Sequence, residues 1–151
     1  MPINVLELHH HAVRVPPGKT EDVARFYEDV LGLKQDRARP HIPAVPGSWH
    51  YIGPEDGPTT QIHVMGAEGV SGIAKGPGHD PTIIHVALAV DDVQQARAEL
   101  DRLGTPYWMA GEAVGTPQIF LYDPAGNMIE LHQIGTCNCN RVGMQRSRGM
   151  A

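Results

Sequence analysis

Alternating apolar and polar residues mark two stretches of the chain that closely match each other. The first, residues 7–15, reads ELHHHAVRV, and the second, residues 83–92, reads IIHVALAVDD. Superposing the two places His10 on His85 and Ala12 on Ala87. A period of two is typical of a half-buried strand, so a strand is predicted in each stretch. The match also indicates an internal repeat.

Each predicted strand is followed by a helical pattern and then by further strands. Apolar residues recur at helical spacing over residues 20–34, with Thr20 as the expected N-cap and Gly32 as the helix end. The second copy of this helix covers residues 91–104. Shorter apolar segments predict the remaining strands, at residues 49–53, 60–66, 117–123 and 128–133. The pattern predicts an α+β fold in which a strand, a helix and a short antiparallel meander occur twice.

The segments between and after the two copies have a different composition. Residues 67–80 are rich in glycine and are predicted to be a linker. Residues 134–151 are basic and show no periodicity, which predicts a flexible tail. The predicted units are therefore a first module at 1–66, the linker at 67–80, a second module at 81–133 and the tail at 134–151.

The direction of side chains along the strands selects one histidine of the three consecutive ones. If Val13 and Val15 pack on the following helix, His9 and His11 share their face and His10 points the other way. The same reasoning turns His85, His63 and Glu130 away from the helices. Three imidazoles and one carboxylate on one inferred face form a set that binds a divalent transition metal. The other four histidines are expected to have structural or solvent-exposed roles: His41, His50, His79 and His132.

Composition excludes several classes of protein. The chain has 41% hydrophobic and 19% charged residues and a net charge of −5, so nucleic acid is not an expected partner. No apolar run reaches the roughly 18 residues that a membrane span needs. The first residues lack the basic start of a signal peptide. The only cysteines, Cys137 and Cys139, make a poor metal site, and a cytoplasmic location is predicted.

Four segments resemble the vicinal oxygen chelate superfamily, which contains glyoxalase I, bleomycin-resistance proteins and ring-cleaving dioxygenases. They read HHAVRV, FYEDVLGL, HVALAVDD and YDPAGNMIEL, and the resemblance runs from about residue 6 to residue 133. It implies two βαβββ modules whose mixed sheets curl around a metal cavity. It also implies metal ligands at His10, His63, His85 and Glu130, and a small-molecule substrate that presents two neighbouring oxygens to the metal.

The resemblance does not select one subfamily. Glyoxalase I normally has glutamate at the position of His63, and methylmalonyl-CoA epimerases usually have glutamine there. Fosfomycin transferases have a threonine that would fall on Ala12. Ring-cleaving dioxygenases use two histidines and a glutamate with iron, usually on longer chains.

Four ligands would leave an octahedral metal two open positions, which suits redox-neutral chemistry on a chelating substrate. We therefore predict a glyoxalase-like lyase or isomerase that uses Zn, Ni, Co, Fe or Mn. Glu130 and His63 are the predicted proton-transfer groups, and Arg14, Tyr51 and His50 the predicted substrate-binding residues. If His63 does not coordinate, the remaining three ligands suit oxygen activation. The alternatives are a ring-cleaving Fe(II) dioxygenase, a fosfomycin-type thiol transferase and a metal-free drug-binding protein.

The expected assembly is a homodimer. Each module has an open sheet edge and half of the ligand set, so the two must pair with something. The long glycine-containing linker predicts that modules are exchanged between two chains, with each site drawn from both.

Overall fold

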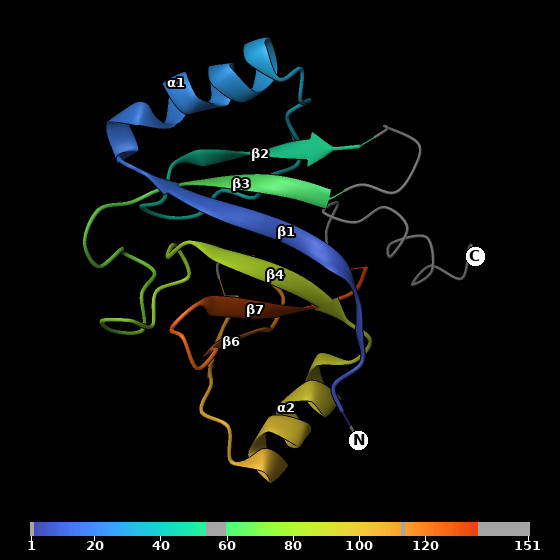
Figure 1. Cartoon of the computed structure of the whole chain (residues 1–151). Coiled ribbons are helices and arrows are strands. Elements are labelled where there is room, and N and C mark those ends of the chain that lie inside the picture. The colour runs from blue at the N-terminus through green and yellow to red at the C-terminus, as the bar shows by residue number, and fades with distance from the viewer. Residues whose placement is uncertain (1, 54–59, 113, 136–151) are drawn as a thin grey trace.

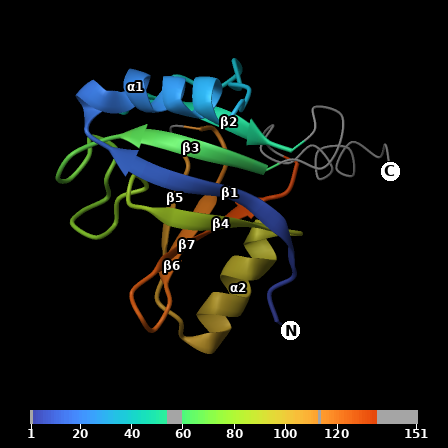
Figure 2. The same cartoon turned by 45° about the horizontal axis from the view of Figure 1, so that its top comes forward.

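The computed structural model describes residues 2–53, 60–112 and 114–135. These residues form one curled, unclosed seven-stranded sheet in the order β2-β3-β1-β4-β7-β6-β5 (Figures 1 and 2). The strands are β1 (Val5–Val15), β2 (Gly47–Ile52), β3 (Thr60–Gly66), β4 (His85–Val90), β5 (Trp108–Ala110), β6 (Gln118–Tyr122) and β7 (Met128–Gln133). The predicted tail from residue 136 onward, with both of its cysteines, lies outside the described residues.

The two halves repeat the same strand pairing, which confirms the α+β fold of two βαβββ units. β1 pairs in parallel with β3, and β4 pairs in parallel with β7. β2 and β6 then add as antiparallel neighbours of β3 and β7. The strand β5, which the sequence pattern did not predict, pairs with β6. Its counterpart in the first half is reduced to a single bridge between Gln35 and His50.

The two halves join within one chain through antiparallel pairing of β1 with β4. His10 pairs with Ala87, and Ala12 pairs with His85. The two central strands of one chain thus satisfy each other's edges, and the exchange of modules between two chains stays a prediction. Both halves of the cavity come from the same chain.

The second helix, α2 (Val93–Leu103), lies within the predicted range 91–104. Asp92 accepts hydrogen bonds from the backbone N–H groups of Gln94 and Gln95, and Gly104 ends the helix with a φ of 67°. The buried face of α2 packs on β6 and β7. This contact holds β7, and with it Glu130, in place.

The first helical segment departs from its prediction. A 3-10 turn, η1 (Pro17–Lys19), precedes α1 (Thr20–Arg25), so Thr20 lies inside the helix and its hydroxyl donates to the Pro17 carbonyl instead of capping. The next segment, η2 (Phe26–Val30), is a π-helix. The wider turn changes which residues share a face, and Phe26 and Val30 are exposed.

No helix in the described ranges is long and apolar enough to cross a membrane.

Candidate metal centre

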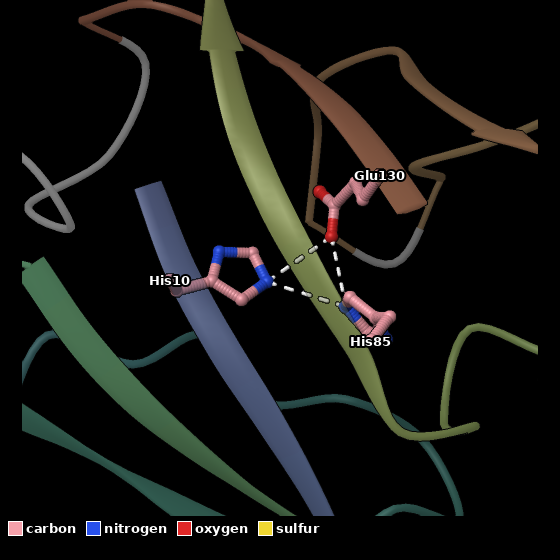
Figure 3. A group of neighbouring side chains, drawn as sticks. All are labelled: His10, His85 and Glu130. Carbon is pink, nitrogen blue, oxygen red and sulfur yellow. Dashed lines mark hydrogen bonds and ion pairs between the residues drawn. The ribbon is translucent and has the colours of Figure 1, made fainter. Parts of the chain in front are cut away.

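Three buried side chains from three neighbouring strands meet at the centre of the sheet (Figure 3). His10 lies on β1, His85 on β4 and Glu130 on β7. The Glu130 Oε2 atom lies 3.1 Å from His10 Nε2 and 3.0 Å from His85 Nε2. The two Nε2 atoms are 3.4 Å apart. Each strand contributes one potential metal ligand to one point.

The spacing of these atoms fits a divalent transition metal. Metal–nitrogen and metal–oxygen bonds of about 2.1 Å place adjacent ligands of an octahedral ion about 3.0 Å apart. The observed separations of 3.0, 3.1 and 3.4 Å match three mutually adjacent positions. Two histidines and one carboxylate in this arrangement leave the remaining positions of the ion to other ligands.

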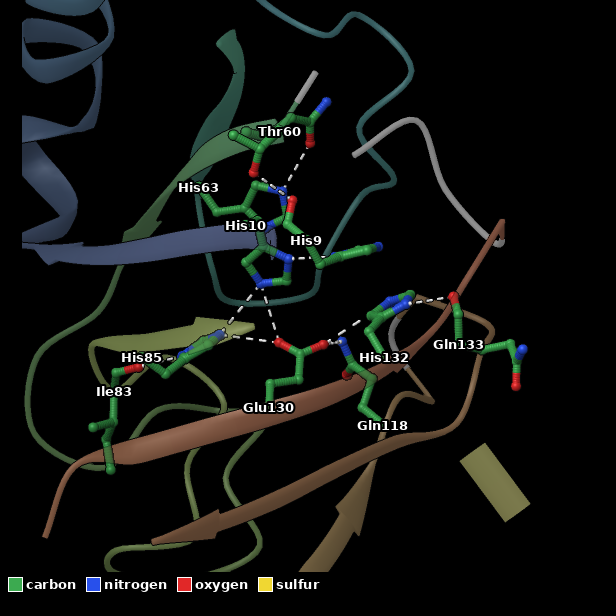
Figure 4. Close-up of polar contacts among 11 residues, drawn as sticks. His9, His10, Thr60, His63, Ile83, His85, Gln118, Glu130, His132 and Gln133 are labelled. Carbon is green, nitrogen blue, oxygen red and sulfur yellow. Dashed lines mark hydrogen bonds and ion pairs between the residues drawn. The ribbon is translucent and has the colours of Figure 1, made fainter. Parts of the chain in front are cut away.

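Each of the three side chains is held by a group behind it (Figure 4). The Nδ1–H of His85 donates to the Ile83 carbonyl at 2.6 Å, so a neutral His85 presents the lone pair of Nε2 to the site. The side-chain amide of Gln118 donates to Glu130 Oε1 at 2.6 Å. His10 Nδ1 faces His9 Nδ1 at 2.8 Å. The site is preorganised by these contacts.

The electrostatic balance favours a neutral His10 beside an ionised Glu130. Burial lowers the pKa of His10, although the nearby Glu130 opposes the shift. Burial raises the pKa of Glu130, but the attraction of His10 and the close contacts with the Nε2 atoms of His10 and His85 outweigh it and hold that pKa well below its usual value. Metal binding needs these protonation states.

His63 lies beside this group rather than in it. Its Nε2 atom bonds to Gln61 Oε1 at 2.8 Å, and the Gln61 amide donates to Asp36 Oδ2 at 3.0 Å. The ring is stacked between Trp49 and His10, at centroid distances of 4.1 and 3.9 Å. Burial, followed by repulsion from His10, holds its pKa well below the usual value. His63, the expected fourth ligand, thus directs its Nε2 atom along β3 toward Gln61.

His9 is the clearest correction to the predicted facing. The β1–β4 ladder pairs Leu8 with Leu88 and His10 with Ala87, so β1 contains one extra residue, a β-bulge. His9 is 1% exposed and borders His10, whereas the sequence pattern placed it on the helix face beside His11. The alternation rule fails because a bulge changes which face the next side chain takes.

His132 was also missed as a neighbour of the site. It is buried, stacks on His9 at 4.0 Å, and its Nε2 atom lies 3.9 Å from Glu130 Oε1. A signal for it was present in the sequence, because His132 follows Glu130 by two residues on β7 and therefore shares its face.

The predicted substrate-binding residues are not brought together at the site. His50 is buried outside the cavity lining, with its Nε2 atom 2.7 Å from Ser48 Oγ, and burial lowers its pKa. Arg14 donates to Thr82 Oγ1 and lies 3.6 Å from Asp80 Oδ2. Tyr51 is half-buried on β2 and, like Arg14, is not among the residues that line the cavity. Arg14 is thus part of a structural ion pair.

The three candidate ligands open into a cavity of about 780 Å³. Trp49 and Phe120 line it together with aliphatic side chains and His63. Trp108 stacks behind Phe120 at 4.5 Å. Among the described lining residues the single cation is Lys75, whose Nζ atom lies 2.8 Å from Glu112 Oε1. The cavity wall is therefore largely apolar, and its one cation is paired.

Comparison with solved structures supports the same fold. Streptomyces coelicolor methylmalonyl-CoA epimerase in complex with 2-nitronate-propionyl-CoA aligns with a TM-score of 0.64 and 14% identity, over 86% of this chain and 95% of that one. The Mycobacterium tuberculosis methylmalonyl-CoA epimerase aligns with a TM-score of 0.62 and 18% identity, over 88% and 91%. The 2,3-dioxygenase LapB from Pseudomonas sp. KL28 aligns with a TM-score of 0.60 and 22% identity, over 87% of this chain and 41% of LapB.

No curated protein matches the sequence at a significant level. A family model does match, and it covers residues 8–131, which include all three candidate ligands and both copies of the repeat. The chain belongs to the Glyoxalase/Bleomycin resistance protein/Dioxygenase superfamily.

Proposed function

We propose that the protein is a metal-dependent enzyme that acts on a small substrate with two neighbouring oxygens. The observation that carries the proposal is the buried group of His10, His85 and Glu130, whose ligand atoms lie 3.0–3.4 Å apart at the cavity. A divalent metal held there would supply Lewis acidity to the substrate oxygens and, as Fe(II), redox chemistry with dioxygen.

The number of ligands favours a ring-cleaving dioxygenase over the lyase that four ligands would suit. Three protein ligands leave room for two substrate oxygens and dioxygen, and a fourth ligand removes that room. The hydrogen bond from His63 to Gln61 supports the three-ligand arrangement. The first candidate is therefore a dioxygenase that cleaves a vicinal diol.

The charge of the cavity narrows the substrate further. Phosphate groups or several carboxylates would need cationic partners, and the one cation among the described lining residues, Lys75, is paired with Glu112. Trp49 and Phe120 offer aromatic faces instead. We propose a diol with an uncharged, flat body rather than an acyl-CoA or a phosphonate.

His63 is the residue best placed to move a proton. The Gln61 amide nitrogen donates to Asp36, so its oxygen accepts from His63, and His63 carries its proton on Nε2. The basic nitrogen of the neutral ring is then Nδ1, and burial keeps the ring neutral near pH 7. His63 can therefore take up the proton of a substrate hydroxyl. The same capacity supports the second candidate, a redox-neutral lyase or isomerase.

Oxygen uptake separates the two candidates. The protein is loaded anaerobically with Fe(II) and mixed with catechol, a neutral alkylcatechol or a carboxylated catechol in an oxygen electrode. We expect uptake with the neutral diols and at least about tenfold lower kcat/KM for the carboxylated one, because its charge meets no cation. The zinc-loaded protein is the control and should consume no oxygen. Absence of uptake, together with isomerisation of a hemithioacetal by the zinc or nickel form, would favour the lyase.

A homodimer in solution stays a prediction, and we now propose that each of its sites is built within one chain. The cytoplasmic location also stays a prediction. A mixing experiment checks the site architecture. Because His10 and Glu130 of one chain share a site, a His10→Ala chain mixed with a Glu130→Gln chain should recover no bound metal. Sedimentation should give twice the 16.4 kDa chain mass. Recovered metal would restore the exchange model.

A further inference from the structure

The two repeat-related histidines of the metal centre are supported differently. His85 Nδ1 donates to a backbone carbonyl, that of Ile83, at 2.6 Å. His10 Nδ1 faces a side chain, that of His9, at 2.8 Å. Ile84, which corresponds to His9 in the repeat, is 56% exposed. Only the first half has a second imidazole in this position within the described residues.

The β-bulge on β1 is what creates this contact. Without the extra residue, consecutive side chains would face opposite sides of the sheet. With it, His9 and His10 are both buried, at 1% and 3% exposure, while Leu8 is 49% exposed. His9 is also stacked on His132 at 4.0 Å, which fixes the plane of its ring. His9 and His10 therefore form a pair whose positions are fixed by the fold.

The chemistry of the pair determines where the protons lie when His10 holds a metal. A ligating Nε2 must present its lone pair, so a neutral His10 carries its proton on Nδ1. That proton points at His9 Nδ1, 2.8 Å away, which must then accept. We infer that His9 is a positioning residue: it accepts the Nδ1–H of His10 and thereby fixes the tautomer and ring orientation in which His10 binds metal.

This inference rests on the metal site of the proposed function but not on the reaction. Partners of metal-bound histidines typically contribute 10–100-fold to metal affinity. They are usually carboxylates or backbone carbonyls, which only accept. An imidazole can instead donate from Nδ1 in its other tautomer, so the His9–His10 hydrogen bond can persist in the metal-free protein with its proton on His9.

Zinc affinity of three variants tests the role of His9. His9→Leu fills a similar volume without an acceptor, whereas His9→Asn offers a side-chain oxygen near the position of Nδ1. We expect the zinc dissociation constant, measured against a chromophoric chelator, to rise about 10–100-fold in His9→Leu and to stay close to wild type in His9→Asn. The matched control is His11→Leu, an exposed position on the same strand, which should bind zinc normally.

A spectroscopic readout separates positioning from packing. In ¹⁵N NMR spectra of the zinc-loaded protein, His10 should show a hydrogen-bonded Nδ1 proton in the wild type and in His9→Asn, and not in His9→Leu. Wild-type affinity in His9→Leu overturns the inference, as does equal loss in both folded His9 variants. If His9→Leu does not fold, the wild-type spectrum decides: absence of a hydrogen-bonded Nδ1 proton on His10 overturns the inference. If the protein binds zinc normally but its iron form takes up no oxygen, the proposed dioxygenase activity is overturned. The positioning role of His9 is then unaffected.

Discussion

Replacing Glu130 by glutamine should remove the metal while the chain stays folded. Glu130 supplies the one carboxylate of the ligand set, and its Oε2 atom lies within 3.1 Å of both histidine nitrogens. A neutral amide loses the charge that offsets a divalent ion and is a weaker ligand. We expect zinc affinity to fall by more than about 100-fold, beyond the range caused by loss of an outer partner. Metal content after mild dialysis measures the change.

The matched control for Glu130→Gln is Glu112→Gln. Glu112 also lines the cavity, but it is paired with Lys75 away from the ligands. This variant should keep one zinc per chain. Circular dichroism should show the same secondary structure for both variants, because Gln118 can still bond to the new amide oxygen. Full metal content in folded Glu130→Gln would show that the site is wrongly assigned.

Replacing His63 by alanine should separate metal binding from turnover. Its Nε2 atom is directed at Gln61, so we expect zinc affinity close to that of the wild type. Loss of the proton acceptor should lower kcat by about 10²–10⁴-fold on the diol that the wild type turns over. Zinc titration and oxygen-uptake rates of the same preparation measure the two quantities.

The sequence pattern alone predicts a different result for His63→Ala, because it places His63 among the ligands. In that case zinc affinity should fall as much as in His85→Ala. The exposed His41, outside the cavity lining, provides the control: His41→Ala should change neither affinity nor kcat. If zinc affinity falls strongly in His63→Ala but not in His41→Ala, His63 is a fourth metal ligand. The lyase then becomes the favoured function again.

Local patterns were enough to predict the fold class and the repeat. Alternation and helical spacing depend on neighbours along the chain, and so does the end of α2 at Gly104, the last residue of the predicted range. The strand register bears out the repeat in detail. His63 pairs with Ala12 as Glu130 pairs with Ala87, which is the correspondence that superposing the two copies gives.

Contacts between distant segments decided the details of the site. The bulge at His9 exists only in the ladder that β1 forms with β4, so no pattern within residues 7–15 could reveal it. The direction of His63 depends on Gln61 and on Asp36 from a separate loop. The sequence by itself determined that four side chains face the cavity: His10, His63, His85 and Glu130. Only the tertiary structure, in which β1 pairs with β4, decided that His10, His85 and Glu130 meet while His63 lies beside them. The distances between these side chains depend on strand register and on side-chain partners, and strand periodicity specifies neither.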